Sequence, residues 1–425
     1  MHTDLASCTF PIADLPGLKK KVLNWLRPFS TFCFLDNQQY PTTSHEAECL
    51  IGAGVKEWVQ TENIQDADVF FQKAKWLFGH LSYDLKVQLH GLSTAKEDPI
   101  GFSLYCFFVP QVVLELKQGS LTIYAEEPAV IFQQISAQPE KKDTFSPPRL
   151  QINPVMSRDA YLQNVKALQA HILRGDCYEI NFCQAFFAEN ILLDPFVIFQ
   201  NLMTVSPNPF SALYRLEDKF LLCASPERFL AKRGNRLISQ PIKGTSKRNL
   251  QNSVHDQQLR QALRMSAKEQ SENVMVVDLV RNDLTKICKP ATVAVDELFG
   301  IYSFPQVHQM ISTISGEIKE NVTFSEILKA TFPMGSMTGA PKLRVMQLID
   351  EYEPTARGLF SGSVGYKTPD GDFDFNVVIR SILYNQTQQY LSYLVGSGIT
   401  FYCNAEQEWE ECMLKAEAIK KVLSV

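Results

Sequence analysis

The sequence predicts a soluble protein in which helices and strands are mixed along the chain. Hydrophobic residues make up 45% of the 425 residues and charged residues 20%, a composition typical of globular proteins. Short apolar runs bounded by turn residues alternate with longer stretches of helical spacing. No apolar run approaches the roughly 18 residues needed to span a bilayer. Length alone favours two or three domains.

Charge and cysteine usage narrow the class of protein. The 41 basic and 46 acidic residues give a net charge of −5, which offers no electrostatic reason to expect a nucleic acid or an anionic membrane as a partner. The polar start Met1–Asp4 lacks the apolar core of a signal peptide. The ten cysteines stand singly, without a Cys-x-x-Cys pair, which favours reduced thiols over disulfides or a zinc site. We therefore expect a cytoplasmic protein.

The first part of the chain, residues 1–150, has fewer regular patterns than the rest. Strand-like runs are predicted at residues 31–35, 76–79, 102–112 and 121–124. Residues 138–148 are rich in proline, lysine and serine, which is typical of a linker that crosses the surface. This stretch is the best candidate boundary, and residues 151–425 form the second region.

The second region predicts many helices and strands. Its first helix begins after Ser157, whose side chain can cap the helix, and ends at Gly175. Further helices are predicted at residues 195–203, 257–284, 323–330, 342–351 and 406–423, and strands at 176–188, 211–215, 220–224, 292–298, 312–314, 361–367, 374–384 and 390–395. All of the polar motifs that suggest chemistry lie in this region.

A lysine on a turn is the first candidate for chemistry. The apolar strand at 220–224 ends at Ser225-Pro226-Glu227-Arg228, and a strand later the turn Pro241–Thr245 presents Lys243. No acidic residue adjoins Lys243 in the sequence. An ammonium group that loses its water becomes a neutral amine more readily, and a neutral amine is a nucleophile. The alternative is an ordinary solvated lysine on a surface turn.

Two glycine-containing segments and one arginine are candidates for binding an anion. The loop Gly335–Lys342 precedes a helix and can present backbone N–H groups at the positive end of the helix dipole, although its spacing is not that of a P-loop. Gly396-Ser397-Gly398 ends a strand, where backbone amides can meet a carboxylate or simply form a tight turn. Arg380 ends the apolar run Val377–Ile379, so its guanidinium requires a partner, either a substrate carboxylate or a structural aspartate.

Acidic residues on two predicted helices are candidates for a metal site. Glu411 and Lys415 are four residues apart and share a face of the last helix. With Glu272 on the earlier helix, Glu411 offers hard oxygen ligands suited to a Mg²⁺ that also meets a substrate carboxylate. The alternative is a solvated charged face. His308 is either a general base near neutral pH or a core histidine with satisfied hydrogen bonds.

In their order and spacing, these motifs resemble the chorismate-utilising enzymes. The resemblance covers residues 155–425 strongly and the earlier residues loosely. It implies an α+β fold, a single large domain of two stacked, mainly antiparallel sheets surrounded by helices, as in anthranilate synthase component I. The blocks that carry the resemblance are Ser225–Leu230, Gln240–Thr245, Glu272–Asp283, Val307–Ile314, Phe332–Lys342, Gly362–Tyr366, Phe375–Arg380 and Gly396–Lys415.

The resemblance assigns a role to each candidate residue. Lys243 matches the family's nucleophile and Glu227 its acid/base partner, with His308 as a pocket histidine. Glu272 and Glu411 match two carboxylates that bind Mg²⁺. The remaining matches line the substrate pocket, with Tyr366 and Arg380 as the pair that holds the enolpyruvyl carboxylate; they are Thr245, Thr338, Gly339, Tyr366, Arg380, Gly396, Ser397, Gly398 and Lys415.

Within the family, the lysine turn is similar to that of aminodeoxychorismate synthases, whereas anthranilate synthases typically carry alanine where Lys243 stands. The resemblance then implies an enzyme that converts chorismate and ammonia to 4-amino-4-deoxychorismate, through a covalent Lys243 intermediate, for p-aminobenzoate and folate biosynthesis. No glutaminase motif is present, so the ammonia is expected from a separate glutamine amidotransferase subunit. The alternatives are anthranilate synthase component I and a catalytically silent chorismate-binding subunit.

The chain departs from the family pattern in three places. Ser397 stands where the family usually has the middle one of three glycines. The segment Thr400–Ala405 lacks the expected Asp-Ser and proline, although the spacing from Gly398 to Glu411 is kept. In some relatives a tryptophan pocket combines an N-terminal Leu-Glu-Ser motif with a segment that matches Pro209-Phe210-Ser211. That N-terminal motif is not found here, so we do not expect feedback by tryptophan.

Overall fold

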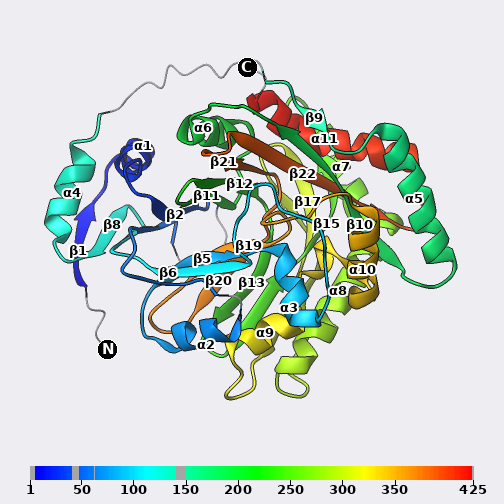
Figure 1. Cartoon of the computed structure of the whole chain (residues 1–425), viewed down its shortest axis with the longest axis horizontal. Helices are drawn as coiled ribbons and strands as arrows, with labels where there is room; N and C mark the ends of the chain where they lie inside the picture. Colours follow the sequence, from blue (N-terminus) through cyan, green and yellow to red (C-terminus); the bar gives the residue numbers. More distant parts are fainter. Residues whose placement is uncertain (1–4, 41–46, 62, 140–149, 424–425) are drawn as a thin grey trace.

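Two large antiparallel sheets form the frame of the protein, and helices cover them (Figure 1). The computed structural model describes residues 5–40, 47–61, 63–139 and 150–423. The fold class implied by the family resemblance is confirmed, because every strand pairing is antiparallel and each sheet draws strands from both parts of the chain. Most of the predicted linker at 138–148 lies outside the described residues.

The first sheet has 12 strands and the second has 10. In order across the first sheet they are β1 (Ala6–Pro11), β8 (Ser120–Ala125), β7 (Val112–Lys117), β3 (Cys49–Ala53), β2 (Thr31–Asp36), β11 (Phe210–Leu216), β12 (Lys219–Ser225), β21 (Ser381–Asn385), β22 (Tyr390–Ile399), β10 (Glu179–Ala188) and β18 (Gly339–Ala340), with β9 (Asn153–Pro154) beside β10. Across the second they are β15 (Ile242–Lys247), β17 (Val307–Glu317), β14 (Arg236–Gln240), β13 (Arg228–Arg233), β20 (Phe373–Asn376), β19 (Ser363–Lys367), β5 (Leu77–Leu81), β6 (Tyr105–Val109) and β4 (Glu57–Val59), with β16 (Ala294–Ser303) beside β17.

The helices are α1 (Leu15–Leu26), α2 (Gln65–Gln72), α3 (Lys86–His90), α4 (Pro128–Ser136), α5 (Arg158–Leu173), α6 (Pro195–Val205), α7 (Ser253–Met265), α8 (Ala267–Ile287), α9 (Phe324–Thr331), α10 (Lys342–Tyr352) and α11 (Ala405–Leu423), with short 3₁₀ turns η1 (Tyr83–Leu85) and η2 (Gly335–Met337). Ser157 caps α5 through a hydrogen bond from the Ala160 amide to its hydroxyl (3.2 Å), as predicted. The single helix predicted at 257–284 is wrong, because Ser266 ends α7 and its side chain caps α8.

The first sheet is buried on both faces, which explains why its central strands are apolar without polar alternation. In β12, Phe220 and Leu222 join the hydrophobic cluster under the outer helices, whereas Leu221 and Cys223 join the cluster between the two sheets. Helices α5, α6 and α11 lie along the first sheet, and α8 lies along the β15 and β17 end of the second (Figure 1). The functional motifs therefore lie on strands of both sheets and on the helices α8 and α11 that cover them.

The strand predicted at 374–384 is interrupted, and the interruption matters for the site. It splits into β20 and β21, and the connecting residue Arg380 has a φ of +51°. A positive φ is uncommon for a residue other than glycine and often marks a functional position. The Arg380 carbonyl accepts a hydrogen bond from the Ala224 amide (3.2 Å), which holds this turn against the end of β12.

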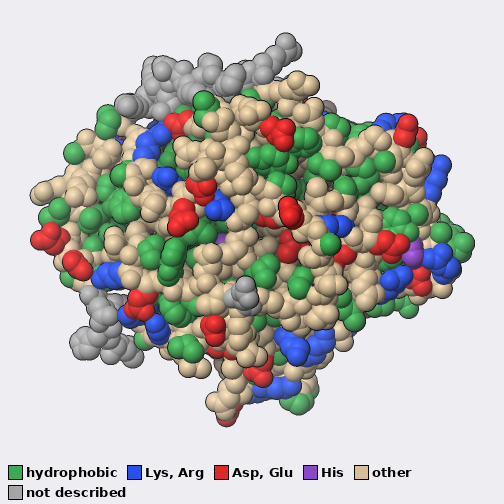
Figure 2. Space-filling model, in the orientation of Figure 1, with side chains coloured by type: hydrophobic (Ala, Val, Ile, Leu, Met, Phe, Trp, Pro, Cys, Tyr) green, Lys and Arg blue, Asp and Glu red, His purple; other side chains and the backbone are tan. Residues whose placement is uncertain are grey.

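Acidic and basic side chains are interspersed over the face of the molecule shown in Figure 2. All ten cysteines lie within the described residues and are free thiols, most of them buried. Among the described residues, no helix combines the length and the apolar character that crossing a membrane requires.

A buried ion pair fixes strand β10 to the loop before α10. Both Arg357 and Glu353 are almost completely buried, and the guanidinium donates to both carboxylate oxygens at 2.6 and 2.8 Å. Arg357 also donates to the carbonyls of Met337 (2.7 Å) and Asn181 (2.8 Å), while Glu353 accepts from the Cys183 amide (2.9 Å). The pair thereby ties the 3₁₀ turn η2 to β10, the strand that begins with Glu179.

Replacing Arg357 by alanine is expected to lower the free energy of unfolding by about 3–5 kcal/mol, because it leaves the Glu353 carboxylate buried and unpaired. Urea denaturation followed by fluorescence measures this change. The matched control is Arg281→Ala, which removes an exposed pair with Asp278 and should change the free energy by less than about 1 kcal/mol. Equal effects of the two substitutions would contradict the role given to Arg357.

Candidate active site

Lys243 lies in a buried ion pair at the centre of the candidate site. Its amine donates to the Glu179 carboxylate over 2.5 Å, and the two side chains are only 12% and 3% exposed. Lys243 follows the first residue of β15, where the register with β17 shifts between Ile242 and Thr245. The interpretation of Lys243 as a surface lysine without an acidic neighbour is therefore wrong. Its partner comes from β10, 64 residues earlier in the chain.

The charge state of Lys243 also differs from the expectation. Burial acts to lower the pKa of the Lys243 amine, but the negative charges of Glu179 and Glu272 outweigh burial, so the pKa is raised above its ordinary value. The side chain is therefore an ammonium near neutral pH. Before it can act as a nucleophile it must give its proton to another group.

Glu227 lies in the turn between β12 and β13 and is almost completely buried. Its carboxylate accepts a hydrogen bond from the Ser336 hydroxyl (2.6 Å), which comes from η2. Burial raises the pKa of Glu227 to about 7, although Ser336 and the charges of Lys243 and Arg380 oppose the increase. A carboxyl group that is half protonated near neutral pH can donate a proton in catalysis.

Arg380 places a partly buried guanidinium beside this carboxyl group. Burial acts to lower the pKa of Arg380, and the negative charge of Glu227 and the hydroxyl of Tyr40 oppose this. Among the described residues, no aspartate or glutamate forms an ion pair with Arg380, and Glu227 is the carboxylate whose charge acts on it. Whether its partner is a substrate carboxylate or a structural aspartate stays a prediction.

The predicted metal ligands come from two helices, Glu272 from α8 and Glu411 from α11. Lys268, one turn before Glu272 on α8, is 3.8 Å from the Glu272 carboxylate. On α11, the Lys415 amine is 2.6 Å from the Glu411 carboxylate. Burial acts to lower the pKa of Lys268, but the negative charges of nearby carboxylates, among them Glu272 and Glu411, raise it above its ordinary value. The two carboxylates therefore belong to one acidic cluster.

The two glutamates differ in charge. Burial raises the pKa of Glu272 to about 7, with Glu179 and Glu269 adding to the increase and Lys243 opposing it. For Glu411, the ion pair with Lys415 outweighs burial and lowers the pKa. Within the described residues, no group of three or more histidine, cysteine, aspartate or glutamate side chains is arranged to hold a metal ion. Two carboxylates remain available to share a metal with a substrate.

The end of β22 packs against both α11 and the lysine pair. The Ser397 hydroxyl is buried and donates to Glu408, and the Lys415 amine donates to the Gly396 carbonyl (2.8 Å). A Cβ atom on Gly398 would lie 3.0 Å from the Glu179 carboxylate and 3.1 Å from the Lys243 amine. The serine that departs from the family pattern thus anchors α11, and the following glycine lets the backbone of β22 pack closely against the ion pair.

The loop before α10 packs tightly against β10. The Thr338 hydroxyl donates to the Met334 carbonyl (3.0 Å), so it is used within the loop. Gly339 pairs with Ile180, and a Cβ atom at position 339 would lie 2.0 Å from the Glu179 carbonyl oxygen. These contacts give Thr338 and Gly339 a part in holding the backbone of Glu179.

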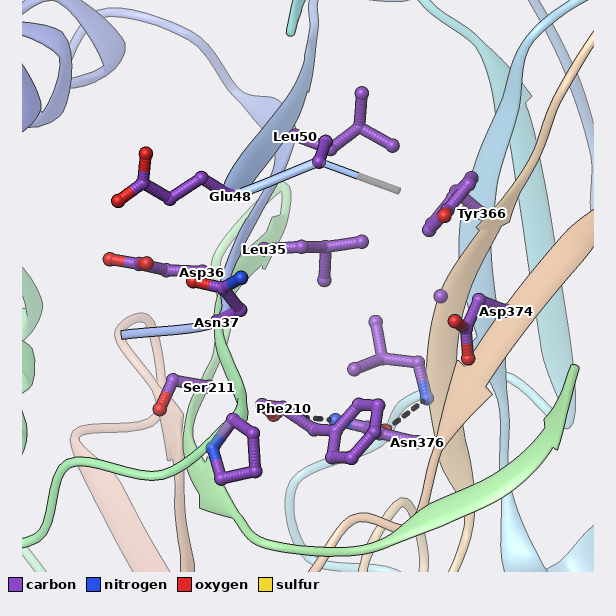
Figure 3. A pocket seen from close by; sticks show the side chains of 14 residues that line it. Leu35, Asp36, Asn37, Glu48, Leu50, Phe210, Ser211, Tyr366, Asp374 and Asn376 are labelled. Carbon is purple, nitrogen blue, oxygen red and sulfur yellow. Dashed lines mark hydrogen bonds between the residues drawn. The ribbon is translucent and has the colours of Figure 1, made fainter. Parts of the chain in front are cut away.

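Three of the predicted residues make their contacts elsewhere. Thr245 is exposed on β15. His308 is buried on β17, where its ring nitrogens are hydrogen-bonded to the Ser303 hydroxyl (2.8 Å) and the Asp256 carboxylate (3.2 Å). Tyr366 lines a separate cavity, which includes none of the other predicted site residues (Figure 3).

The cavity of Tyr366 lies between the two sheets (Figure 3). One side comes from the end of β2, at Leu35, Asp36 and Asn37, and from Phe210 on β11. On the other side, Asn376 of β20 donates to the Phe210 carbonyl (3.1 Å) and accepts from the Val364 amide (3.0 Å). The structure therefore places Tyr366 and the segment Pro209–Ser211 around one cavity.

Sequence reasoning missed several residues that complete the site. Glu179 pairs with Lys243, Ser336 donates to Glu227, and Lys268 on α8 is close enough for the charges of both Glu272 and Glu411 to act on it. The available signal was a charged residue at the start of a strand that is otherwise mainly apolar, because a buried charge requires a partner. That signal identifies Glu179 as unusual but does not identify its partner.

Comparisons with known proteins show which family the chain is similar to. The family described as chorismate binding enzymes matches residues 25–421. Aminodeoxychorismate synthase component 1 of Salmonella typhimurium is 39% identical over 264 residues, which are 62% of this chain and 57% of that protein. An anthranilate synthase component I-like protein of Synechocystis sp. is 33% identical over 354 residues, or 82% of this chain and 72% of that protein.

The fold has a counterpart among solved structures. Anthranilate synthase component I from Streptococcus pneumoniae superposes with a TM-score of 0.77 and covers 92% of each chain. The two sequences are 22% identical over this match, so the likeness concerns the fold alone. The match to the Salmonella protein spans little more than half of that protein. The reaction that this chain catalyses is therefore a proposal that depends on its own site.

Replacing Glu227 by glutamine is expected to make the protein relatively more stable as the pH rises. The folded-state pKa is about 7 and the ordinary value is 4.5, so the native protein loses stability between these values as the buried carboxyl group ionises. The glutamine variant lacks this loss. The difference in unfolding free energy between variant and native protein should therefore grow by about 2 kcal/mol from pH 5 to pH 8.

Urea denaturation at the two pH values measures this difference. Glu417→Gln, which removes an exposed carboxylate from α11, is the control and should show a difference that does not change with pH. A pH-independent difference for Glu227→Gln would mean that the buried carboxyl group is not protonated in the folded protein.

Proposed function

Because the chain belongs to the family of chorismate binding enzymes, we propose that it is component 1 of an aminodeoxychorismate synthase. In this reaction the C4 hydroxyl of chorismate is replaced by an amino group from ammonia. The observation that carries the proposal is Lys243, an amine buried beside Glu179 in the same site as Glu227, whose carboxyl pKa burial raises to about 7. An amine in this position supports attack on a substrate by a covalent route.

The charges of the site suit a dianionic ring. Arg380 offers a guanidinium to one carboxylate of chorismate. Glu272 and Glu411 would hold Mg²⁺ next to the other, because hard carboxylate oxygens supplemented by substrate oxygens are the usual ligands of this ion. When bound, Mg²⁺ would neutralise the C1 carboxylate and draw electron density from the diene.

The residues of the chain then divide the chemistry between them. The neutral amine of Lys243 forms a bond to C2, the double bonds shift along the ring, and the C4–O bond breaks. Glu227 gives its proton to the departing hydroxyl, which leaves as water. Ammonia forms a bond to C4, the double bonds shift back, and the bond between C2 and Lys243 breaks. Glu227 takes the proton that the new amino group releases.

The source of ammonia and the fate of the product follow from the same proposal. Ammonia would come from a glutamine amidotransferase subunit, and a lyase would convert the product to p-aminobenzoate for folate synthesis in the cytoplasm. The free thiols of all ten cysteines fit a reducing compartment.

Two other functions remain to be separated by experiment. Anthranilate synthase component I is favoured by the name of the Synechocystis relative, but Lys243 stands where such enzymes typically carry alanine. A catalytically silent subunit would not need the buried set of Lys243, Glu227 and Arg380.

Purified protein incubated with chorismate, ammonium chloride and Mg²⁺ should produce 4-amino-4-deoxychorismate, identified by mass spectrometry of the quenched mixture. Omission of Mg²⁺ should abolish the product. Lys243→Ala should lower product formation by at least about 100-fold, as expected for loss of a covalent nucleophile. The control Lys247→Ala removes an exposed lysine from the same strand and should leave the rate unchanged.

Three outcomes would count against the proposal. Anthranilate as the main product would support the first alternative, and no turnover with any ammonium concentration would support the silent subunit. Undiminished formation of aminodeoxychorismate by Lys243→Ala would exclude the lysine from the chemistry.

A further inference from the structure

We propose that Glu179 is the positioning residue for Lys243: it fixes the amine in the site and accepts the proton that the amine must lose before it attacks. This inference rests on the proposed function and adds a residue to its mechanism. None of the family motifs identified in the sequence includes Glu179. Its role is derived from four features of the structure.

The first feature is the contact itself. The carboxylate lies 2.5 Å from the amine, within the reach that direct proton transfer requires. Glu179 pairs with Ala340 of β18, and the following residue Ile180 pairs with Ile399 of β22. The backbone of Glu179 is thus held by its pairing with β18, next to the first residue of β10 that pairs with β22, which fixes the point from which the carboxylate reaches the lysine.

The second feature is the second carboxylate oxygen. The Oε2 atom of Glu179 is buried and has no hydrogen-bond partner among the described residues. Buried polar atoms are nearly always paired, so an unpaired one calls for an explanation. Among the described residues, Lys243 is the group that donates to this carboxylate, so the Oε2 atom is left without a donor that a protein group would normally supply.

The third feature is the close packing of β22 against the pair. A Cβ atom at Gly398 would lie 3.0 Å from the carboxylate and 3.1 Å from the amine. The glycine therefore lets the backbone of β22 approach both charged groups, whose side chains are only 3% and 12% exposed. With so little water around them, the cost of keeping two opposite charges is high.

The fourth feature is the set of charges around the lysine. Glu272 and Glu269 come from α8, Glu227 from the β12–β13 turn and Glu411 from α11. The carboxylates that face Lys243 raise its pKa, so solution at neutral pH does not supply a neutral amine. A proton acceptor within the site can supply the neutral amine, and Glu179 is the carboxylate in contact with Lys243.

The proton balance closes over one turnover. Glu179 takes a proton from the Lys243 ammonium, which converts the ion pair to a neutral acid and a neutral amine. The amine forms the bond to C2, and Glu227 protonates the leaving hydroxyl. When ammonia adds at C4 and the bond at C2 breaks, Lys243 leaves as the neutral amine. Glu179 then returns its proton, and Glu227 is reprotonated by the new amino group.

The test compares two pH profiles in native protein and in Glu179→Gln. The titration of Lys243 is followed by NMR of protein labelled with ¹³C at the lysine ε carbon, with the signal assigned by its loss in Lys243→Arg. The rate of covalent modification by chorismate, in the presence of Mg²⁺ and without ammonia, is followed by rapid quench and mass spectrometry from pH 5.5 to 7, below the pKa of Glu227.

In native protein, the modification rate should stay flat over this range although Lys243 titrates at a much higher pH. In Glu179→Gln, the lysine midpoint should fall by at least one pH unit, because a neighbouring negative charge is lost. The modification rate should then follow the fraction of neutral amine, at about tenfold per pH unit below the new midpoint. A purely structural ion pair would move the midpoint but would not change the shape of the rate profile.

Two further variants keep the test decisive. Glu179→Asp retains a carboxylate on a side chain that is one methylene shorter. Chorismate should modify this variant more slowly than native protein, but the rate should be equally independent of pH. The aspartate variant replaces the glutamine variant if the latter does not fold. Glu410→Gln, which removes an exposed carboxylate on α11, should match native protein in both profiles.

The inference is overturned if the modification rate of native protein follows the fraction of neutral amine or if Glu179→Gln keeps the native rate profile. It is also overturned if chorismate does not modify native protein at all. The proposed function fails separately. A product other than aminodeoxychorismate would refute the proposed function while the two rate profiles still decide the role of Glu179.

Discussion

The contact between Lys243 and Glu179 is the interaction on which the rest of the site depends. Two charges buried this deeply are tolerated only as a pair, and the fold provides the pair by bringing β10 and β15 together from opposite sheets. The loop before α10 packs against the Glu179 carbonyl, and the Arg357–Glu353 pair fixes that loop. Substitutions in this loop or in the Arg357–Glu353 pair should therefore change the activity by moving the Glu179 carboxylate.

Much of the fold was predictable because its signals are local. The apolar runs at 220–224 and 31–35 are buried strands, and the Ser157 cap begins a helix where expected. The break at Ser266 was not predicted, because the apolar stripe continues past it and only the cap geometry ends one helix and begins the next. The stacking of the two sheets came from family resemblance, since strand order depends on contacts far apart in the chain.

The site was predictable to a smaller extent, for a related reason. Motif positions identified Glu227, Lys243, Glu272 and Arg380, and the structure brings their charges together. The charge state of Lys243 was not predictable, because its partner is 64 residues away and a strand sequence does not say which strand it will face. The same limit applies to Tyr366, whose motif position gave no indication that its ring lines the cavity between the sheets.

In the proposed reaction, the buried ammonium of Lys243 loses its proton and becomes a covalent nucleophile. Peptide mapping of native protein, quenched after mixing with chorismate and Mg²⁺ in the absence of ammonia, shows whether this bond forms. We expect a single modified peptide in which Lys243 carries the mass of chorismate less one water. An unmodified Lys243 peptide in protein that forms product when ammonia is supplied would contradict it.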